Sequence, residues 1–151
     1  MAESQEQFML EIVTPQRIVF SDTVQEAVFP GEEGYFGVLA GHEPFLATLG
    51  SGQLKYRKEG IERVLAVHSG FVEVLPDKVI VLTENAELPE EIDVARAETA
   101  KQRGEIRLKN PTEGTDLDRA RAAIMRAVAR LTVAETMRSR RGPQPERPHP
   151  K

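Results

Sequence analysis

Four glycines and a histidine gather in the stretch from Pro30 to Pro44, PGEEGYFGVLAGHEP, where they could serve as a phosphate cradle or a catalytic loop. The glycines at positions 31, 34, 37 and 41 fit neither GxGxxG nor GxxxxGK[ST], and no helix follows, so we reject a phosphate loop. His42 stands beside Glu43, but neighbours along a chain rarely form a working catalytic pair. Two interpretations remain open: glycine turns fixed by the histidine, or a docking surface on a rigid scaffold.

Other catalytic chemistry finds little support. The chain has no cysteine and three histidines, one of them in the C-terminal tail, so we expect no metal site and no disulfide. A hydrolase that uses Ser69 with His68 is an alternative. Neighbouring residues on a strand point to opposite faces, which places that pair poorly. We therefore expect no catalytic residues.

Charge is distributed unevenly along the 151 residues, whose net charge is −4. The first ninety residues are mostly acidic, whereas arginine is frequent from Arg96 to Arg141, which indicates an anionic partner for the C-terminal part. Nucleic acid is disfavoured because no stacking aromatics accompany the arginines. No signal peptide or membrane span is evident, so membrane association would have to go through a partner.

The elements that must position these residues change character at Leu88-Pro89. Before it, short β-rich segments separated by turn residues predict a β-sandwich or barrel over residues 1–87. These segments are FMLEIV, RIVF, VQEAVF, QLKYR, VLAVHSGFVEV and KVIVLT.

After that point the pattern is helical. Pro89 and acidic neighbours predict a helix to about Leu108, in which Gly104 costs about 1 kcal/mol relative to alanine. Thr115 with Asp118 resembles a capping box and predicts a second helix from Asp116 to about Arg140. Heptad spacing, with Leu117, Ile124 and Leu131 on one seam and Ala120, Ala127 and Ala134 on another, predicts packing against a partner helix. We expect a helical hairpin over residues 88–141 and a disordered Pro-rich tail over 142–151.

Two long blocks resemble one known family. GEEGYFGVLAGHEPFLATLGSG is similar to the signature of the epsilon subunit of bacterial-type F-type ATP synthases, and AVHSGFVEVLPDKVIVLTENAE and RAVARLTVAE continue the match. The similarity covers about residues 8 to 137. It implies an N-terminal antiparallel β-sandwich followed by a C-terminal two-helix antiparallel hairpin, in agreement with the change of period.

The resemblance also implies a function. The chain would be a non-catalytic rotor subunit in the central stalk of a proton-translocating ATP synthase, peripheral to the cytoplasmic face of the bacterial plasma membrane. Its sandwich would dock on the gamma subunit and the c-ring. Its hairpin would reach the alpha/beta catalytic head and inhibit ATP hydrolysis. The docking residues implied by the resemblance are Glu32, Tyr35, Phe36, Gly37, Val38 and His42.

A second motif, IDVARA, resembles the I/L-D-x-x-R-A sequence with which some bacterial epsilon subunits bind ATP. ATP would then be a regulatory ligand, because no Mg²⁺ ligand or water-activating group accompanies the motif. The ATP-binding residues implied by the resemblance are Glu87, Ile92, Asp93, Arg96, Ala97, Arg103, Arg126 and Arg130. Four guanidiniums suit a triphosphate because they offer charge-assisted hydrogen bonds.

Helix geometry limits how those arginines can meet. Arg96 and Arg103 share one helix face, and so do Arg126 and Arg130. The second pair lies roughly opposite the seam of Leu117, Ile124 and Leu131, so the four converge only if that seam faces something other than the first helix. A free-standing ATP-binding sensor is the alternative function; it would be a stable monomer that binds ATP without co-purifying with gamma.

Overall fold

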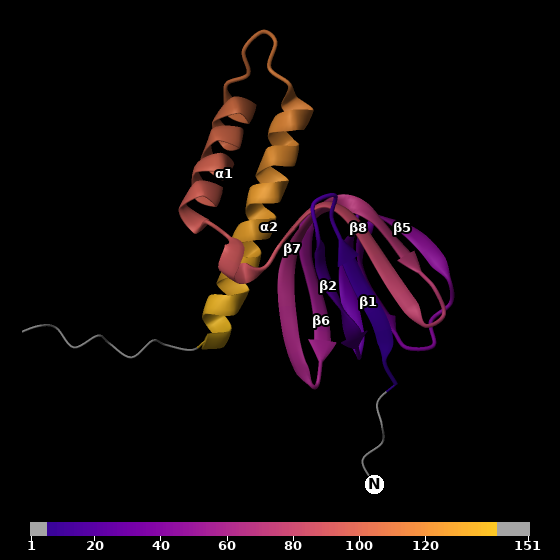
Figure 1. Cartoon of the computed structure of the whole chain (residues 1–151). Coiled ribbons are helices and arrows are strands. Elements are labelled where there is room, and N and C mark those ends of the chain that lie inside the picture. Colours follow the sequence, from indigo (N-terminus) through magenta and orange to yellow (C-terminus); the bar gives the residue numbers. More distant parts are fainter. Residues whose placement is uncertain (1–5, 142–151) are drawn as a thin grey trace, which may run out of the picture.

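The computed structural model describes residues 6–141, and the tail expected to be disordered, 142–151, lies outside that range. Figure 1 shows an N-terminal body of strands and two long helices, of which α2 lies beside the strands and α1 lies on the far side of α2; both project beyond the body. The chain therefore has the predicted fold class, a β-sandwich followed by a two-helix hairpin.

The strands form one continuous hydrogen-bonded system that folds into the sandwich. Its order is β2-β1-β8-β7-β5-β3-β4, and β6 pairs with both β3 and β7. All pairs are antiparallel except β1 with β8, which run parallel and join the first strand to the last. The strands are β1 Phe8–Val13, β2 Ile18–Val24, β3 Glu26–Gly31, β4 Gly34–Leu39, β5 Phe45–Leu49, β6 Gly52–Lys58, β7 Ile61–Val74 and β8 Lys78–Glu87.

Alternation along the strands fills the core. In β1, Phe8, Leu10 and Ile12 are buried while the residues between them are not, because successive side chains of a strand point to opposite faces. Phe29 of β3 and Leu54 of β6 join the same cluster. The aliphatic composition thus yields one core that lies between the layers of the sandwich.

The glycine-rich stretch is largely strand rather than loop. β3 and β4 form a hairpin across it, and β5 begins one residue after its end. Gly34 has φ 132° and Gly41 has φ 79°, so both positions favour glycine. The His42 ring nitrogens face the carbonyl oxygens of Leu39 and Leu75. The interpretation of glycine turns and a loop-fixing histidine is confirmed at these positions.

A break in the pairing of β7 with β8 changes which face of β7 meets the core. Before it, odd-numbered Leu65 and Val67 point into the core, and after it even-numbered Val72 does so. Ser69 has φ 55° and Gly70 has φ 144° at this break. Ser69 and Glu84 are unpaired at this point, although the register of the two strands is the same on both sides, and β8 also changes its buried face there, between Thr83 and Ala86. As a result, the face that carries His68 turns toward the helices.

The helical part begins one turn later than expected. Pro89–Glu91 form a short 3-10 turn, η1, and α1 runs from Val94 to Lys109 because Asp93 caps it by accepting a hydrogen bond from the Arg96 amide. Helix α2 is Leu117–Arg141. Its cap is Asp116, which accepts from the Arg119 amide, so the predicted Thr115 capping box is wrong.

Close packing joins the two helices through small residues. Ala97 and Gly104 of α1 and Ala120 and Ala127 of α2 are buried. A Cβ added to Gly104 would lie 2.5 Å from Cγ1 of Ile124, so this glycine allows the helices to approach closely. The predicted seam around Ile124 therefore does face the first helix.

Candidate functional site

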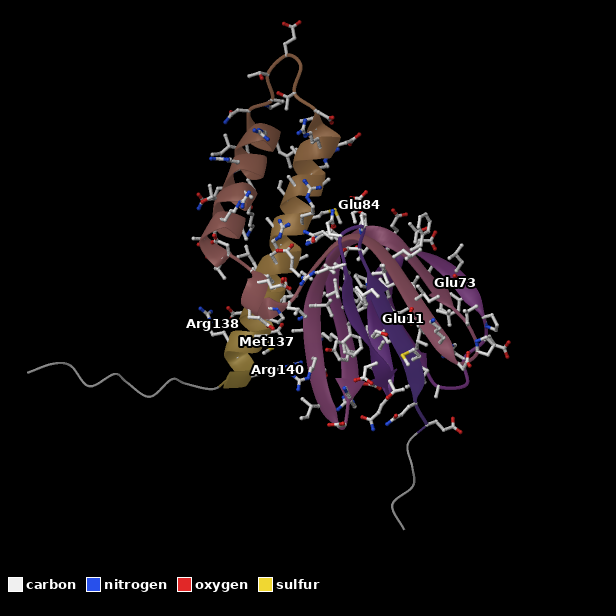
Figure 2. The ribbon with its side chains drawn as sticks, in the orientation of Figure 1. Glu11, Glu73, Glu84, Met137, Arg138 and Arg140 are labelled. Carbon is white, nitrogen blue, oxygen red and sulfur yellow. The ribbon has the colours of Figure 1, made fainter. Side chains whose placement is uncertain are left out.

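The sandwich and the hairpin meet at a small interface formed by α2 on β6 and β7. Its apolar centre consists of Val64, Ala66 and Val133, with Ile92 and Met137 packed against them. Polar contacts surround it: Gln53 Nε2 donates to Thr136 Oγ1 at 2.9 Å, and Arg140 bonds the side chain and the carbonyl oxygen of Glu62. Figure 2 shows Met137 and Arg140 at the end of α2 that lies beside the sandwich.

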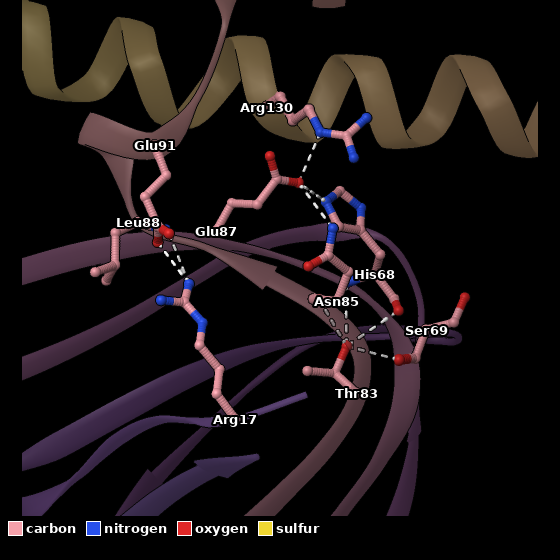
Figure 3. Close-up of polar contacts among 9 residues, drawn as sticks. All are labelled: Arg17, His68, Ser69, Thr83, Asn85, Glu87, Leu88, Glu91 and Arg130. Atoms are coloured by element: carbon pink, nitrogen blue, oxygen red, sulfur yellow. Dashed lines mark hydrogen bonds and ion pairs between the residues drawn. The ribbon is translucent and has the colours of Figure 1, made fainter. Parts of the chain in front are cut away.

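Glu87 and Arg130, two of the predicted ATP-binding residues, are in contact across this interface. Arg130 Nε donates to Glu87 Oε1 at 2.7 Å, and His68 Nε2 lies 3.0 Å from the same oxygen (Figure 3). Burial by itself raises the pKa of the Glu87 carboxyl, but the hydrogen bonds from His68 and Arg130 outweigh burial, so the pKa is lowered. The carboxylate is therefore ionised at neutral pH.

The other predicted arginines do not gather around that contact. Arg96 and Arg103 are exposed on α1, while Arg126 is half-buried on the α2 face that carries Arg130. Within residues 6–141, the side chains of these three arginines form no hydrogen bond or ion pair. Because the Ile124 seam faces α1, the two pairs of arginines lie on different faces of the hairpin. The arrangement leaves three guanidiniums free for an anion without bringing all four together.

The remaining residues of the IDVARA motif have structural roles. Asp93 caps α1, Ala97 is buried at the helix crossing, and Ile92 packs on the cluster around Val133. Just before them, Glu91 accepts from Arg17 Nη2 at 2.7 Å and from the Leu88 amide. The hydrogen bond from Arg17 is the main cause that lowers the pKa of Glu91. This contact ties the start of the helical part to the sandwich.

The six predicted docking residues differ in how accessible they are. Val38 is buried, and Phe36 packs beside Phe29 and Phe45. Tyr35 is 60% exposed although its hydroxyl accepts a hydrogen bond from the backbone amide of Gln53. Glu32 and Gly37 are exposed, and His42 is half-buried where it holds its turn.

A broader apolar face lies on the sheet of β1, β8, β7 and β5. Phe71 and Leu82 stand directly opposite each other and are 53% and 51% exposed. Together with Thr48 and Glu32 they line a groove of about 610 Å³. Sequence reasoning missed this face, although strict alternation around buried Val72 and Val81 could have indicated outward-facing Phe71 and Leu82.

Acidic side chains accompany the apolar residues of this face. Glu73 lies opposite Leu46 in the β5–β7 register, two residues from Phe71, and Glu84 lines the same groove. Figure 2 shows Glu73 on the part of the sandwich remote from the hairpin. The combination suits a partner that offers an apolar surface with basic groups around it.

The pair considered for hydrolysis is not arranged for it. His68 is buried under α2 and bonds Glu87, whereas Ser69 follows it at the break in strand pairing, where its backbone has φ 55°. Within the described chain, no three His, Cys, Asp or Glu side chains gather as a metal site would require. Neither α1 nor α2 combines the length and apolar character that crossing a bilayer demands.

Comparisons with known proteins agree with the fold. The model of the family described as ATP synthase, Delta/Epsilon chain, beta-sandwich domain matches residues 7–89, and that of its long alpha-helix domain matches residues 90–135. The ATP synthase epsilon chain of Syntrophobacter fumaroxidans is 49% identical over 130 residues, which cover 86% of this chain and 97% of that protein. The epsilon chain of Desulforapulum autotrophicum is 49% identical over 132 residues, covering 87% and 98%.

Solved structures give the same arrangement of elements. A chain in the cryo-EM structure of the Euglena gracilis mitochondrial ATP synthase, OSCP/F1/c-ring, superposes with a TM-score of 0.65 at 24% identity and covers 89% of this chain and 81% of its own length. A chain of the Tetrahymena thermophila mitochondrial ATP synthase central stalk and c-ring gives 0.54 at 12% identity, covering 89% and 98%. At these identities the likeness concerns the fold.

Proposed function

The chain belongs to the delta/epsilon chain family of the ATP synthase, and from that premise we propose that it is a non-catalytic rotor subunit in the central stalk of a proton-translocating complex. In this role the sandwich docks on the gamma subunit and the c-ring, and the hairpin regulates ATP hydrolysis. The subunit is then peripheral to the cytoplasmic face of the plasma membrane. The observation that carries the proposal is the contrast between a large unpartnered apolar face and a small, partly polar contact with the hairpin.

Docking is supported by the exposed apolar face of β5, β7 and β8. A contiguous apolar patch on a soluble domain commonly marks a partner surface, because leaving it in water costs free energy. We expect Leu82→Asp to reduce co-purification with gamma strongly, since it places a charge at the centre of the face. Ile61→Asp is the matched control, because Ile61 is 55% exposed at the far end of β7. Equal loss with both variants would contradict docking through this face.

Regulation is supported by the way the hairpin is held. Helix α1 packs chiefly on α2, and three buried residues form the apolar centre of the hairpin–sandwich contact. Such a contact can open while both parts keep their own cores, so the hairpin can take up two positions of similar free energy. In the second position it would reach the alpha/beta catalytic head and block ATP hydrolysis.

The test of regulation is a truncation. Removing residues 88–151 from the subunit in the assembled complex should raise ATP hydrolysis and leave assembly intact. Unchanged hydrolysis would exclude the inhibitory role for this protein. Loss of assembly would instead show that the hairpin belongs to the docking surface.

ATP is proposed as the ligand that favours the docked hairpin. The support is the set of unpaired guanidiniums of Arg96 and Arg103 on α1 and of Arg126, which shares its helix face with Arg130. A ligand that binds the docked form alone stabilises it by about 2.7 kcal/mol at a hundredfold excess over Kd. Calorimetric titration of ATP into the isolated chain should show binding that Arg96→Ala and Arg126→Ala both weaken. Binding unaffected by either variant would refute this site.

A further inference from the structure

One row of side chains on β7 lies under α2 and changes from apolar to polar along its length. Val64 and Ala66 meet Val133 in the apolar centre of the interface. His68, the next residue of the row, is a fully buried side chain with 2% of its surface exposed. A polar ring at such a position costs free energy unless its nitrogens have partners.

Within residues 6–141, one nitrogen of the His68 ring has a hydrogen-bond partner and the other has none. Nε2 lies 3.0 Å from Glu87 Oε1, and because an ionised carboxylate can only accept, Nε2 carries the proton and donates. Nδ1 is buried without a hydrogen-bond partner among the described residues. A leucine would fill this place without leaving an unpaired polar atom. The contribution that distinguishes histidine here is therefore its bond to Glu87.

Glu87 is a residue of the sandwich that bonds the hairpin directly, through Arg130 of α2. Its Oε1 accepts from Arg130 Nε of α2, from His68 Nε2 of β7 and, at 3.4 Å, from Asn85 Nδ2 of β8. Figure 3 shows these donors converging on one carboxylate oxygen from opposite sides of the interface. From β6, Gln53 bonds Thr136 of α2 instead. Without His68, Glu87 would keep one long hydrogen bond from the sandwich and could turn toward solvent.

We propose that His68 is a positioning residue for hairpin docking: it holds the Glu87 carboxylate in the orientation that receives Arg130. The Glu87–Arg130 contact keeps the hairpin docked without a bound ligand, because the Glu87 carboxylate accepts the hydrogen bond that the Arg130 guanidinium would otherwise donate to an anionic ligand. When the hairpin undocks, Glu87 stays hydrogen-bonded to His68 and Asn85. The carboxylate therefore keeps hydrogen-bond partners, and its contact with Arg130 can re-form. The inference deepens the proposed regulation and rests on the hairpin being the regulatory element.

A double-mutant cycle on the isolated full-length chain tests this role. The chain has no cysteine, so cysteines introduced at exposed Thr112 in the hairpin loop and Asp77 in the sandwich can carry two labels whose separation reports docking. The ratio of undocked to docked hairpin is measured across a urea series. We expect His68→Leu to raise it roughly tenfold, in the range expected for a hydrogen bond to a charged group.

A second substitution, at an arginine of α2, shows whether His68 positions Glu87 or merely fills space in the interface. In an Arg130→Gln background, His68→Leu should change the ratio less than about twofold, because the residue it positions for is gone. In an Arg140→Gln background the tenfold effect should persist, since Arg140 bonds Glu62 at the other end of the interface. His68→Gln should restore most of the docking, because its amide can donate to Glu87.

Three results would overturn the proposal: the same fold-change in both arginine backgrounds, tighter docking in His68→Leu, or no rescue by His68→Gln. Far-UV circular dichroism of each variant confirms that the sandwich remains folded, and His68→Gln gives the comparison if His68→Leu unfolds. Hydrolysis by the assembled complex is measured separately. If the cycle behaves as expected while hydrolysis is insensitive to docking, the positioning role stands and the regulatory function fails.

Discussion

Gly104 sets two physical effects of opposite sign against each other. It lies in the middle of α1, where alanine should be better than glycine by about 1 kcal/mol of helix propensity. It is also buried against α2, and a Cβ placed there would lie 2.5 Å from Cγ1 of Ile124 and 3.3 Å from the carbonyl oxygen of Ala120. Gly104→Ala therefore shows which effect dominates.

We expect the steric overlap of the added Cβ to outweigh the gain in helix propensity. Cγ1 is bonded directly to the Ile124 Cβ, so it moves away only if the side chain changes rotamer or the helices separate. The Ala120 oxygen belongs to the α2 backbone and cannot move independently. Overpacking of this kind costs about 1–3 kcal/mol, so after subtraction of the helix propensity we expect the hairpin to lose about 1 kcal/mol.

Amide hydrogen exchange along α1 and α2 measures that loss as a lower free energy of opening. The control is the pair Gln102→Gly and Gln102→Ala, which gives the propensity difference at an exposed position of the same helix. In an Ile124→Ala background, Gly104→Ala should become stabilising because the Ile124 atoms that would overlap the added Cβ are absent. If Gly104→Ala stabilises the hairpin in the presence of Ile124 as much as the Gln102 pair differs, the close-packing explanation is wrong.

Three further perturbations probe the rest of the chain. Gly70→Ala places a Cβ 1.9 Å from the Leu82 carbonyl oxygen where φ is 144°, so urea unfolding should show a loss of about 3 kcal/mol or more, and an unchanged midpoint would contradict this. Val133→Ala removes two buried methyl groups and should weaken docking by about 2 kcal/mol in exchange experiments; unchanged protection of α2 would argue against the apolar cluster. The lowered pKa values of Glu87 and Glu91 stabilise the fold fully above the ordinary carboxyl pKa of 4.5 and progressively less as pH falls below it. Docking should accordingly be constant near neutral pH and weaken in acid, and Glu87→Gln should flatten that profile.

The sequence predicted the elements whose patterns are local. β-rich segments between turn residues, FMLEIV and KVIVLT among them, identified β1 and β8, while Pro89 with its acidic neighbours and the heptad spacing around Ile124 predicted two helices that pack together. The β4 and β5 strands were missed because the glycines of PGEEGYFGVLAGHEP, Gly34 and Gly41 among them, indicate turns and conceal the short strands between and after them. Thr115 was taken as the α2 cap, but the carboxylate of Asp116, one residue later, accepts the capping hydrogen bond.

Long-range partners could not be derived from spacing. Arg130 and Glu87 are 43 residues apart, and His68 lies on the face of β7 that meets both of them only up to the break in strand pairing at Ser69. Nothing in VLAVHSGFVEV marks the residue at which strand parity changes, apart from the Ser-Gly pair that could equally well be a turn. The position of this break depends on contacts with β8, where the Thr83 hydroxyl bonds the carbonyl oxygens of His68 and Ser69. Contacts of this kind are set by tertiary structure.

The parallel pairing of β1 with β8 has a consequence for biosynthesis. While the chain leaves the ribosome, Leu10 and Ile12 have no neighbour on their β8 side until Val79 and Val81 emerge, so the sandwich cannot close before its last strand is made. Closure requires nothing from α1 or α2, which are translated afterwards. The sandwich can therefore fold first, and the hairpin then docks on an already folded surface. Newly made chains would then complete the sandwich before the hairpin.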